Sequence, residues 1–132
     1  MNSGPFGDLG DELHMTVPPY SHFLRSVRLV AADAAVRAGL DCEETEDFRL
    51  AVDELCHTMM SSTDHSLRLT FTATRSGVCA RGATEARAGT RPMISALSAT
   101  IVTALADAYE LERVDDELRF IVRRNHTGAR AR

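Results

Sequence analysis

The sequence contains no lysine, so all fifteen of its basic residues are arginines, and nineteen acidic residues outnumber them. The formal net charge is −4 at pH 7, and no candidate helix carries a basic stripe. The charge pattern therefore excludes direct nucleic-acid binding by the body of the chain. Only residues 125–132 and the two positions before them are arginine-rich, and we expect 125–132 to form a basic flexible tail. A contact between this tail and phosphate or an acidic partner is the alternative.

Cysteine is scarce, and its three occurrences, Cys42, Cys56 and Cys79, stand singly. No C-x-x-C spacing is present, so neither a zinc site nor a disulfide framework is indicated. A reducing cytoplasm is the compartment that suits such a protein.

Long hydrophobic runs are absent as well. No stretch approaches the roughly 18 apolar residues that a membrane span needs. The N-terminal residues lack the positive start and the apolar segment of a secretory signal. We therefore expect a cytoplasmic protein without membrane segments.

What is present is the composition of one ordinary globular domain, with 44% hydrophobic and 26% charged residues. Residues 1–10 are rich in glycine, proline and aspartate, and we expect them to be disordered. The interpretation is a disordered N-terminus at 1–10, a single domain at 11–124 and the tail at 125–132.

Hydrophobic periodicity predicts the elements of this domain, because apolar residues recur every second position in strands and every 3.6 positions in helices. In chain order, the expected elements are a strand at 13–17, helices at 20–38 and 41–60, strands at 67–74 and 78–80, a loop at 81–91, a helix at 93–108 and a hairpin at 109–124. Gly39 suits the end of the first helix, and Asp41 with Glu44 suits a capping box that opens the second. The order predicts an α+β fold: a two-layer sandwich with a mixed, mostly antiparallel sheet of about five strands and three helices on one face.

The second helix ends in “FRLAVDELCHTMM”, residues 48–60, whose apolar stripe is flanked by Glu54 and Thr58, one turn apart. Cys56 lies on the stripe, where a free cysteine behaves as a small buried hydrophobe rather than a redox sensor. Asp53 and His57 are spaced to form a surface pair. Glu54 and His57 also have the E-x-x-H spacing of half a di-iron site, but no second copy of that spacing with partner glutamates appears.

The segments “FRLAVDE” and “TALAD”, in this order of elements, resemble the anti-sigma-factor kinases of the GHKL ATPase superfamily, the RsbW and SpoIIAB type. The resemblance extends from about residue 12 to residue 124 and is closest to short actinobacterial anti-sigma factors of the UsfX type. It implies a GHKL (Bergerat-like) fold. It also implies a homodimer, an alternative sigma factor as partner, and an anti-anti-sigma protein of the STAS type as antagonist.

In that family a helix carries a glutamate that acts as general base toward a serine of the anti-anti-sigma protein. Four residues later an asparagine holds the magnesium ion that bridges the ATP phosphates. Glu54 keeps the first position, and Thr58 occupies the second, from which a hydroxyl could contact hydrated magnesium. The resemblance thus implies Glu54 as the base and Thr58 as the cofactor-binding residue.

The nucleotide motifs of the family are eroded here. Its kinases carry an Asp-x-Gly-x-Gly box and a second glycine-rich segment at the ATP lid. Between residues 78 and 92 this chain offers only “VCARGATEARAGTRP”, which contains Gly82 and Gly89 but no aspartate. We therefore predict a shortened or absent lid, weakened binding of ATP and Mg²⁺, and a protein more suited to binding partners than to catalysis.

The first helix supplies the candidate partner contacts, Arg25 and Arg28, because arginine suits desolvated contacts with carboxylates. The alternative is that both are solvated surface charges. The function that the sequence predicts is sequestration of an alternative sigma factor, released by an anti-anti-sigma partner. The alternatives are an active serine kinase of the anti-anti-sigma protein, and a pseudo-kinase scaffold that binds only anti-anti-sigma proteins.

Overall fold

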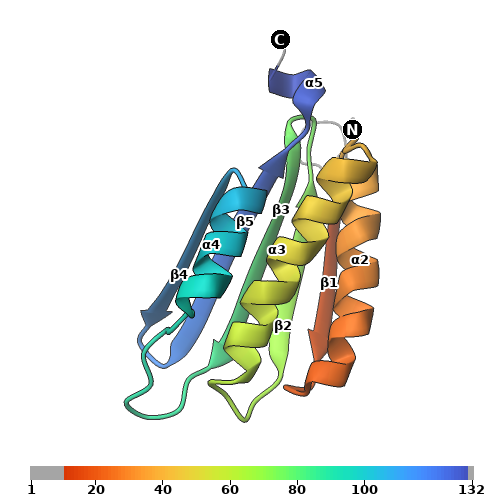
Figure 1. Cartoon of the computed structure of the whole chain (residues 1–132). Coiled ribbons are helices and arrows are strands. Elements are labelled where there is room, and N and C mark those ends of the chain that lie inside the picture. Colours follow the sequence, from red (N-terminus) through yellow and green to blue (C-terminus); the bar gives the residue numbers. More distant parts are fainter. Residues whose placement is uncertain (1–10, 131–132) are drawn as a thin grey trace.

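A computed structural model of the chain describes residues 11–130. The predicted disorder of residues 1–10 lies outside the described residues. The elements, labelled in Figure 1, are β1 (Asp11–Val17), the 3₁₀ turn η1 (Ser21–Phe23), α2 (Leu24–Arg37), α3 (Cys42–Met60), β2 (Leu67–Ala73), β3 (Gly77–Glu85), α4 (Ala96–Leu105), β4 (Ala108–Val114), β5 (Glu117–Asn125) and α5 (Thr127–Arg130).

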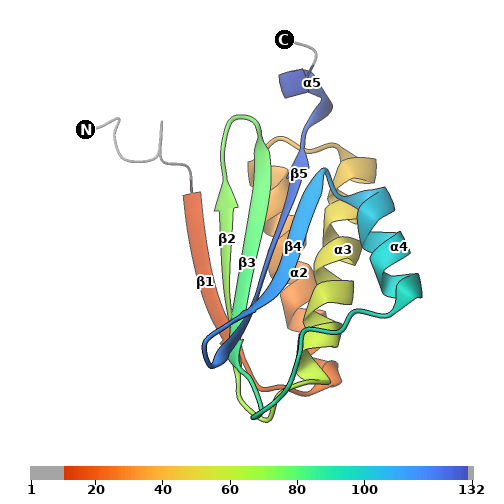
Figure 2. The same cartoon turned by 90° about the vertical axis from the view of Figure 1, so that its left-hand side faces the viewer.

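The strands form one sheet in the order β1-β2-β3-β5-β4, and every neighbouring pair is antiparallel. Helices α2, α3 and α4 all pack on the same face of this sheet, as the side view in Figure 2 shows. The predicted α+β sandwich, with five strands and three helices on one face, is confirmed. The sequence predicted a mixed, mostly antiparallel sheet, and the described strands form a wholly antiparallel one.

The joint between α2 and α3 has the local chemistry that the sequence predicts. Gly39 has φ 87°, the left-handed conformation that glycine adopts without steric cost. Asp41 Oδ1 accepts a hydrogen bond from the Glu44 backbone N–H at 2.8 Å, and Glu44 Oε1 accepts one from the Asp41 N–H at 2.9 Å. Both halves of the capping box are thus present, and they fix where α3 begins.

The core lies between the sheet and the three helices. Phe48 of α3 meets Phe71 of β2 edge to face, with ring centroids 6.5 Å apart and an interplanar angle of 77°. Both rings are fully buried. The other large apolar side chains with less than 2% exposure are Leu55, Met59, Leu67, Leu69, Leu118, Val27, Val52, Val102 and Val122. This packing makes α3 the central helix, because it contacts α2, α4 and the sheet.

The strand β3 is longer than the sequence predicted. It runs from Gly77 to Glu85, so the predicted strand at 78–80 was too short and the predicted loop at 81–91 is wrong for residues 81–85. Its inward positions hold small or polar residues, which hide the alternation. At Gly82 a side chain would collide with the ring of Phe120, since a Cβ atom would lie 2.2 Å from Cε2. Thr84 is fully buried, and its hydroxyl donates to the backbone oxygen of Ser66 at 3.0 Å.

The third large helix, α4, is shorter than the predicted range of 93–108. Ser95 is its N-cap, and the Ser95 Oγ atom accepts a hydrogen bond from the Ser98 backbone N–H at 3.0 Å. The helix ends at Leu105 because Ala106 is extended and leads directly into β4.

At the C-terminal side, β5 continues to Asn125, so the predicted boundary between domain and tail falls inside a strand. Thr127 then binds back to the start of α3, donating from its backbone N–H to Glu44 Oε2 at 2.7 Å and from its hydroxyl to the same oxygen. Arg124 forms ion pairs with Asp47 at 3.1 Å and with Asp107 at 3.4 Å. These contacts join the last strand to α3.

Candidate functional site

The helix α3 places Glu54 and Thr58 one turn apart, next to α4. The Thr58 hydroxyl donates to the backbone oxygen of Glu54 at 2.9 Å, a bond of a helical threonine to its own preceding turn. Only 9% of Thr58 is exposed. The hydroxyl hydrogen is therefore already used, and a cation could reach only the lone pairs of a nearly buried oxygen.

The Glu54 carboxylate is half-buried and points at α4. Its Oε1 atom accepts a hydrogen bond from the Ser98 hydroxyl at 2.7 Å. Ser98 lies in the first turn of α4, where its backbone is held by the Ser95 cap. Sequence reasoning missed Ser98, because it is 44 positions from Glu54 and no local spacing links the two.

A carboxylate that accepts a serine hydroxyl at this distance has the geometry of a general base beside its nucleophile. In this chain the serine belongs to the protein itself. A hydroxyl from another molecule could reach Glu54 Oε1 only if Ser98 moved. Glu54 can therefore bind a hydroxyl group, and in this structure the hydroxyl of Ser98 occupies that position.

The connection between β3 and α4, residues 86–95, is tied to its surroundings. Arg87 binds Asp64 through two hydrogen bonds, at 3.0 and 2.9 Å, and the guanidinium holds the pKa of that carboxyl below its usual range. Arg113 of β4 donates to the backbone oxygens of Arg87 and Thr90 at 3.0 and 2.8 Å. These arginine contacts fix the connection against β4 and the end of α3.

The two glycines that might have cradled phosphate lie in different settings. Gly82 is inside β3 and packs against Phe120. Gly89 has φ 75° within the connection, with open space around its Cα. Gly82 therefore serves packing, and only Gly89 has a backbone free to approach a ligand.

The candidate partner residues of α2 differ in their surroundings. Arg25 is exposed, whereas Arg28 is half-buried and forms an ion pair with Asp53 of α3 at 2.7 Å. Asp53 thus binds Arg28 across the two helices, while the predicted pairing of Asp53 with His57 is not observed. Any partner that used Arg28 would compete with this internal ion pair.

Cys56 is completely buried in the core, as the sequence predicted. Burial, followed in importance by the negative charge of Asp53, raises the pKa of its thiol far above the usual value. The thiol therefore stays protonated and unreactive at neutral pH.

No group of three or more histidine, cysteine, aspartate or glutamate side chains in residues 11–130 is arranged to hold a metal ion. No helix in the same range is long and apolar enough to cross a membrane.

The arrangement of sheet and helices matches a solved structure, that of the RsbU and RsbW domains of Rv1364c from Mycobacterium tuberculosis. The TM-score is 0.66, and the match covers 87% of this chain and 32% of that chain at 15% sequence identity. The chain has an RsbW-like fold. At this identity the similarity concerns the fold alone, and the chain spans about a third of the matched structure. No protein-family model and no curated protein matches the sequence.

The RsbW-like fold presents two different surfaces. On the helical side, α2 is exposed along one flank, and α3 and α4 meet at the Glu54–Ser98 hydrogen bond. On the other side, no described helix covers the sheet (Figure 2).

Proposed function

We propose that this chain is an anti-sigma-factor-like regulator, which binds an alternative sigma factor and blocks its access to RNA polymerase. An anti-anti-sigma protein of the STAS type competes for the regulator and releases the sigma factor. The RsbW-like fold supports this proposal, together with the sequence resemblance to short anti-sigma factors of the UsfX type. The observation that carries it is an unpartnered apolar stripe on α2.

The stripe on α2 consists of Leu29, Ala32 and Val36, which recur at a spacing of three and four residues and so share one helix face. Leu29 is 68% exposed and Val36 is 64% exposed. Large aliphatic side chains at this spacing are the anchors by which one amphipathic helix packs against another. Arg25 lies one turn before Leu29 and extends the stripe with a positive charge.

These residues suit a helix of a sigma factor that carries apolar anchors and carboxylates. Arg25 is free to contact a carboxylate of the partner, and bidentate pairing would favour arginine over other cations. Arg28 instead positions α2 on α3 through Asp53. We include a homodimer in the proposal, with α2 and the edge strand β1 as the candidate contact region.

Substitution of Leu29 by glutamate should weaken sigma-factor binding. The new carboxylate would be buried in the centre of an apolar contact without a partner. Its desolvation should weaken the complex at least roughly tenfold. The measurement is co-purification from a panel of alternative sigma factors, followed by titration calorimetry with the factor retained.

Leu97→Glu is the matched control, because Leu97 is 71% exposed on α4 and the change in charge is the same. It should bind the sigma factor within about twofold of the original protein. Equal losses in both variants would show that the effect is one of charge alone. Retention of no sigma factor by the unmodified protein would reject the proposal.

A second candidate, an active serine kinase, is favoured by one observation: Glu54 holds a serine hydroxyl at 2.7 Å. In this alternative, a serine of the anti-anti-sigma protein displaces Ser98, and Glu54 accepts its proton while ATP and Mg²⁺ bind nearby through residues that include Thr58. The eroded motifs argue against it.

Calorimetric titration with Mg-ATP and an assay of phosphate transfer to a STAS-type protein separate this candidate from the first. If Glu54 is the base, Glu54→Ala should reduce transfer by roughly a hundredfold or more. Glu43→Ala, an exposed glutamate on the same helix, should leave it unchanged. Absence of nucleotide binding at millimolar concentration would leave a partner-binding protein.

A further inference from the structure

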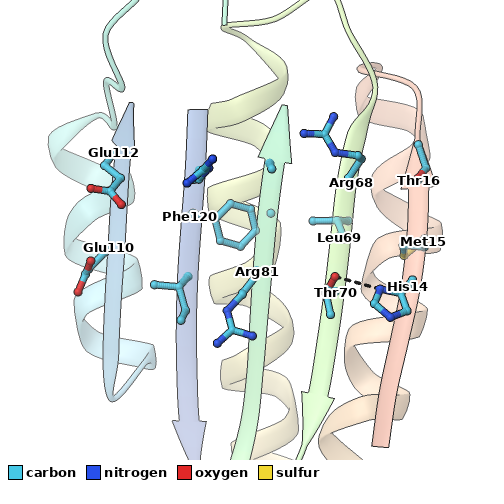
Figure 3. Close-up of a pocket in the computed structure, with 14 residues that line it drawn as sticks. His14, Met15, Thr16, Arg68, Leu69, Thr70, Arg81, Glu110, Glu112 and Phe120 are labelled. Carbon is cyan, nitrogen blue, oxygen red and sulfur yellow. Dashed lines mark hydrogen bonds between the residues drawn. The ribbon is translucent and has the colours of Figure 1, made fainter. Parts of the chain in front are cut away.

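The uncovered face of the sheet carries a groove with a volume of about 660 Å³. Strand register places its outward side chains in two adjacent rows that cross all the strands. One row contains Thr16, Arg68, Ala83, Arg119 and Glu112, and the next contains His14, Thr70, Arg81, Ile121 and Glu110. Figure 3 shows many of these side chains along the same face of the sheet.

The small side chain of Ala83 in the middle of the first row leaves the hollow. Ala83 lies between the long side chains of Arg68 and Arg119, and Thr70 and Ile121 flank Arg81 in the next row. Ala83, Ile121 and the backbone between the two rows contribute apolar surface to its lining. A concave, mainly apolar hollow of this volume falls in the size range of small-molecule sites.

The centre of the groove is positively charged. Glu117 neutralises part of this charge, accepting from Arg119 Nε at 2.9 Å and from an Arg68 guanidinium nitrogen at 2.5 Å, and both arginines lower the pKa of that carboxyl. Arg81 has no carboxylate within ion-pair distance in the described part of the chain. Arg68 and Arg119 therefore share the Glu117 carboxylate, and the Arg81 guanidinium is left available to an anion.

The edge strand β4 forms an acidic end of the groove. Glu110 and Glu112 are exposed there, and neither forms an ion pair with any described residue. Arg81 and Glu110 belong to the same row, two strands apart, which corresponds to roughly 9.5 Å between their backbones. The groove thus has an anion-binding centre and, across an apolar floor, a wall that accepts hydrogen bonds.

We propose that this groove is a binding site for a small amphiphilic anion: an apolar body that carries a carboxylate, sulfonate or phosphate group. The acidic group binds Arg81, with Arg119 and Arg68 beside it. The apolar body lies over Ala83, Thr70 and Ile121, and a donor group at its far end meets Glu110. The site is on the face opposite to α2 and Glu54, so the proposal does not rest on the proposed function.

The test is a fluorescence titration of the full chain with anilinonaphthalenesulfonate, an aromatic sulfonate whose emission rises in apolar surroundings. We expect saturable binding at one site. Arg81→Glu removes the cation, and Ala83→Leu fills the floor without changing charge; each should weaken binding by about tenfold or more. Arg81 is exposed and Ala83 is half-buried, and thermal unfolding checks that each variant is folded.

Two variants away from the groove serve as matched controls. Arg91→Glu makes the same charge change at an exposed position in the connection before α4, and Ala104→Leu makes the same volume change at an exposed position of α4. Both should bind the probe as the original protein does. The proposal is overturned if the groove variants bind as well as the controls, if Arg91→Glu loses binding equally, or if the original protein binds no probe. A dimer that closes this face gives the last result and also overturns it.

Discussion

Replacing Phe71 with alanine should lower the free energy of unfolding by about 3–5 kcal/mol, the largest effect that we expect from a single substitution. Phe71 is fully buried in β2, and its ring packs edge to face against Phe48 of α3. Truncation removes apolar area from the core and leaves a cavity between the sheet and its central helix. The surrounding side chains cannot collapse to fill it, because the flanking strands hold them in register.

Urea unfolding followed by circular dichroism measures this effect as a shift of the midpoint at unchanged slope. Val36→Ala is the control, since Val36 is 64% exposed and its truncation should change stability by no more than about 0.5 kcal/mol. A double-mutant cycle with Phe48→Ala should show a coupling of about 0.5–1.5 kcal/mol. A loss below about 1 kcal/mol for Phe71→Ala would contradict the described core.

The second large effect is expected at Glu44. Its carboxylate is nearly buried, and it accepts hydrogen bonds from the Asp41 backbone N–H, the Thr127 backbone N–H and the Thr127 hydroxyl. Glu44→Ala leaves these donors without their acceptor, so the free energy of unfolding should fall by about 2–3 kcal/mol. Glu43→Ala, at the exposed neighbouring position, should have little effect in the same urea experiment.

Glu44 also makes stability depend on pH. The hydrogen bond from the Thr127 side chain, and then that from the Asp41 backbone, lower its pKa from the ordinary value of 4.5. A carboxyl with a lowered folded pKa stabilises the fold above its unfolded pKa, and this stabilisation is lost as pH falls through the folded value. Unfolding midpoints should therefore drop with pH below about 4.5. Glu44→Gln should flatten the decline relative to Glu43→Gln, though Asp64 and Glu117, whose pKa values are also lowered, keep part of it. Equal declines in the two variants would contradict this role.

Much of the fold could be predicted where local chemistry and periodicity agree. The capping box at Asp41 and Glu44 and the left-handed Gly39 are local devices, and they set the start of α3 and the end of α2 in the structure as in the sequence. The second half of β3 could not be predicted. Gly82 and Thr84 look like loop residues, yet the first makes room for Phe120 and the second bonds to the backbone of Ser66. Both reasons depend on distant partners.

The sites were predictable to different degrees. Glu54 and Thr58 were found by resemblance, but the serine that occupies Glu54 was not, because α3 and α4 meet only in the folded chain. The sequence pattern assigned Arg81 to a loop. Because of that error, the groove on the open face of the sheet could not be predicted. A strand extended to residue 85 would have placed Arg81 on the same sheet face as Arg68 and Arg119, in the adjacent row.

The position of β5 inside the sheet sets the order in which the protein can mature. Residues 117–125 lie between β3 and β4, and among the described residues 11–130 they supply the only strand partner of β4. During synthesis, every other strand and all three large helices leave the ribosome before this strand is available. Until then the chain exposes the unpaired edge of β3 and the core side of α3. A nascent chain of this protein therefore has to be kept from aggregating until β5 inserts between β3 and β4, which are synthesised before it.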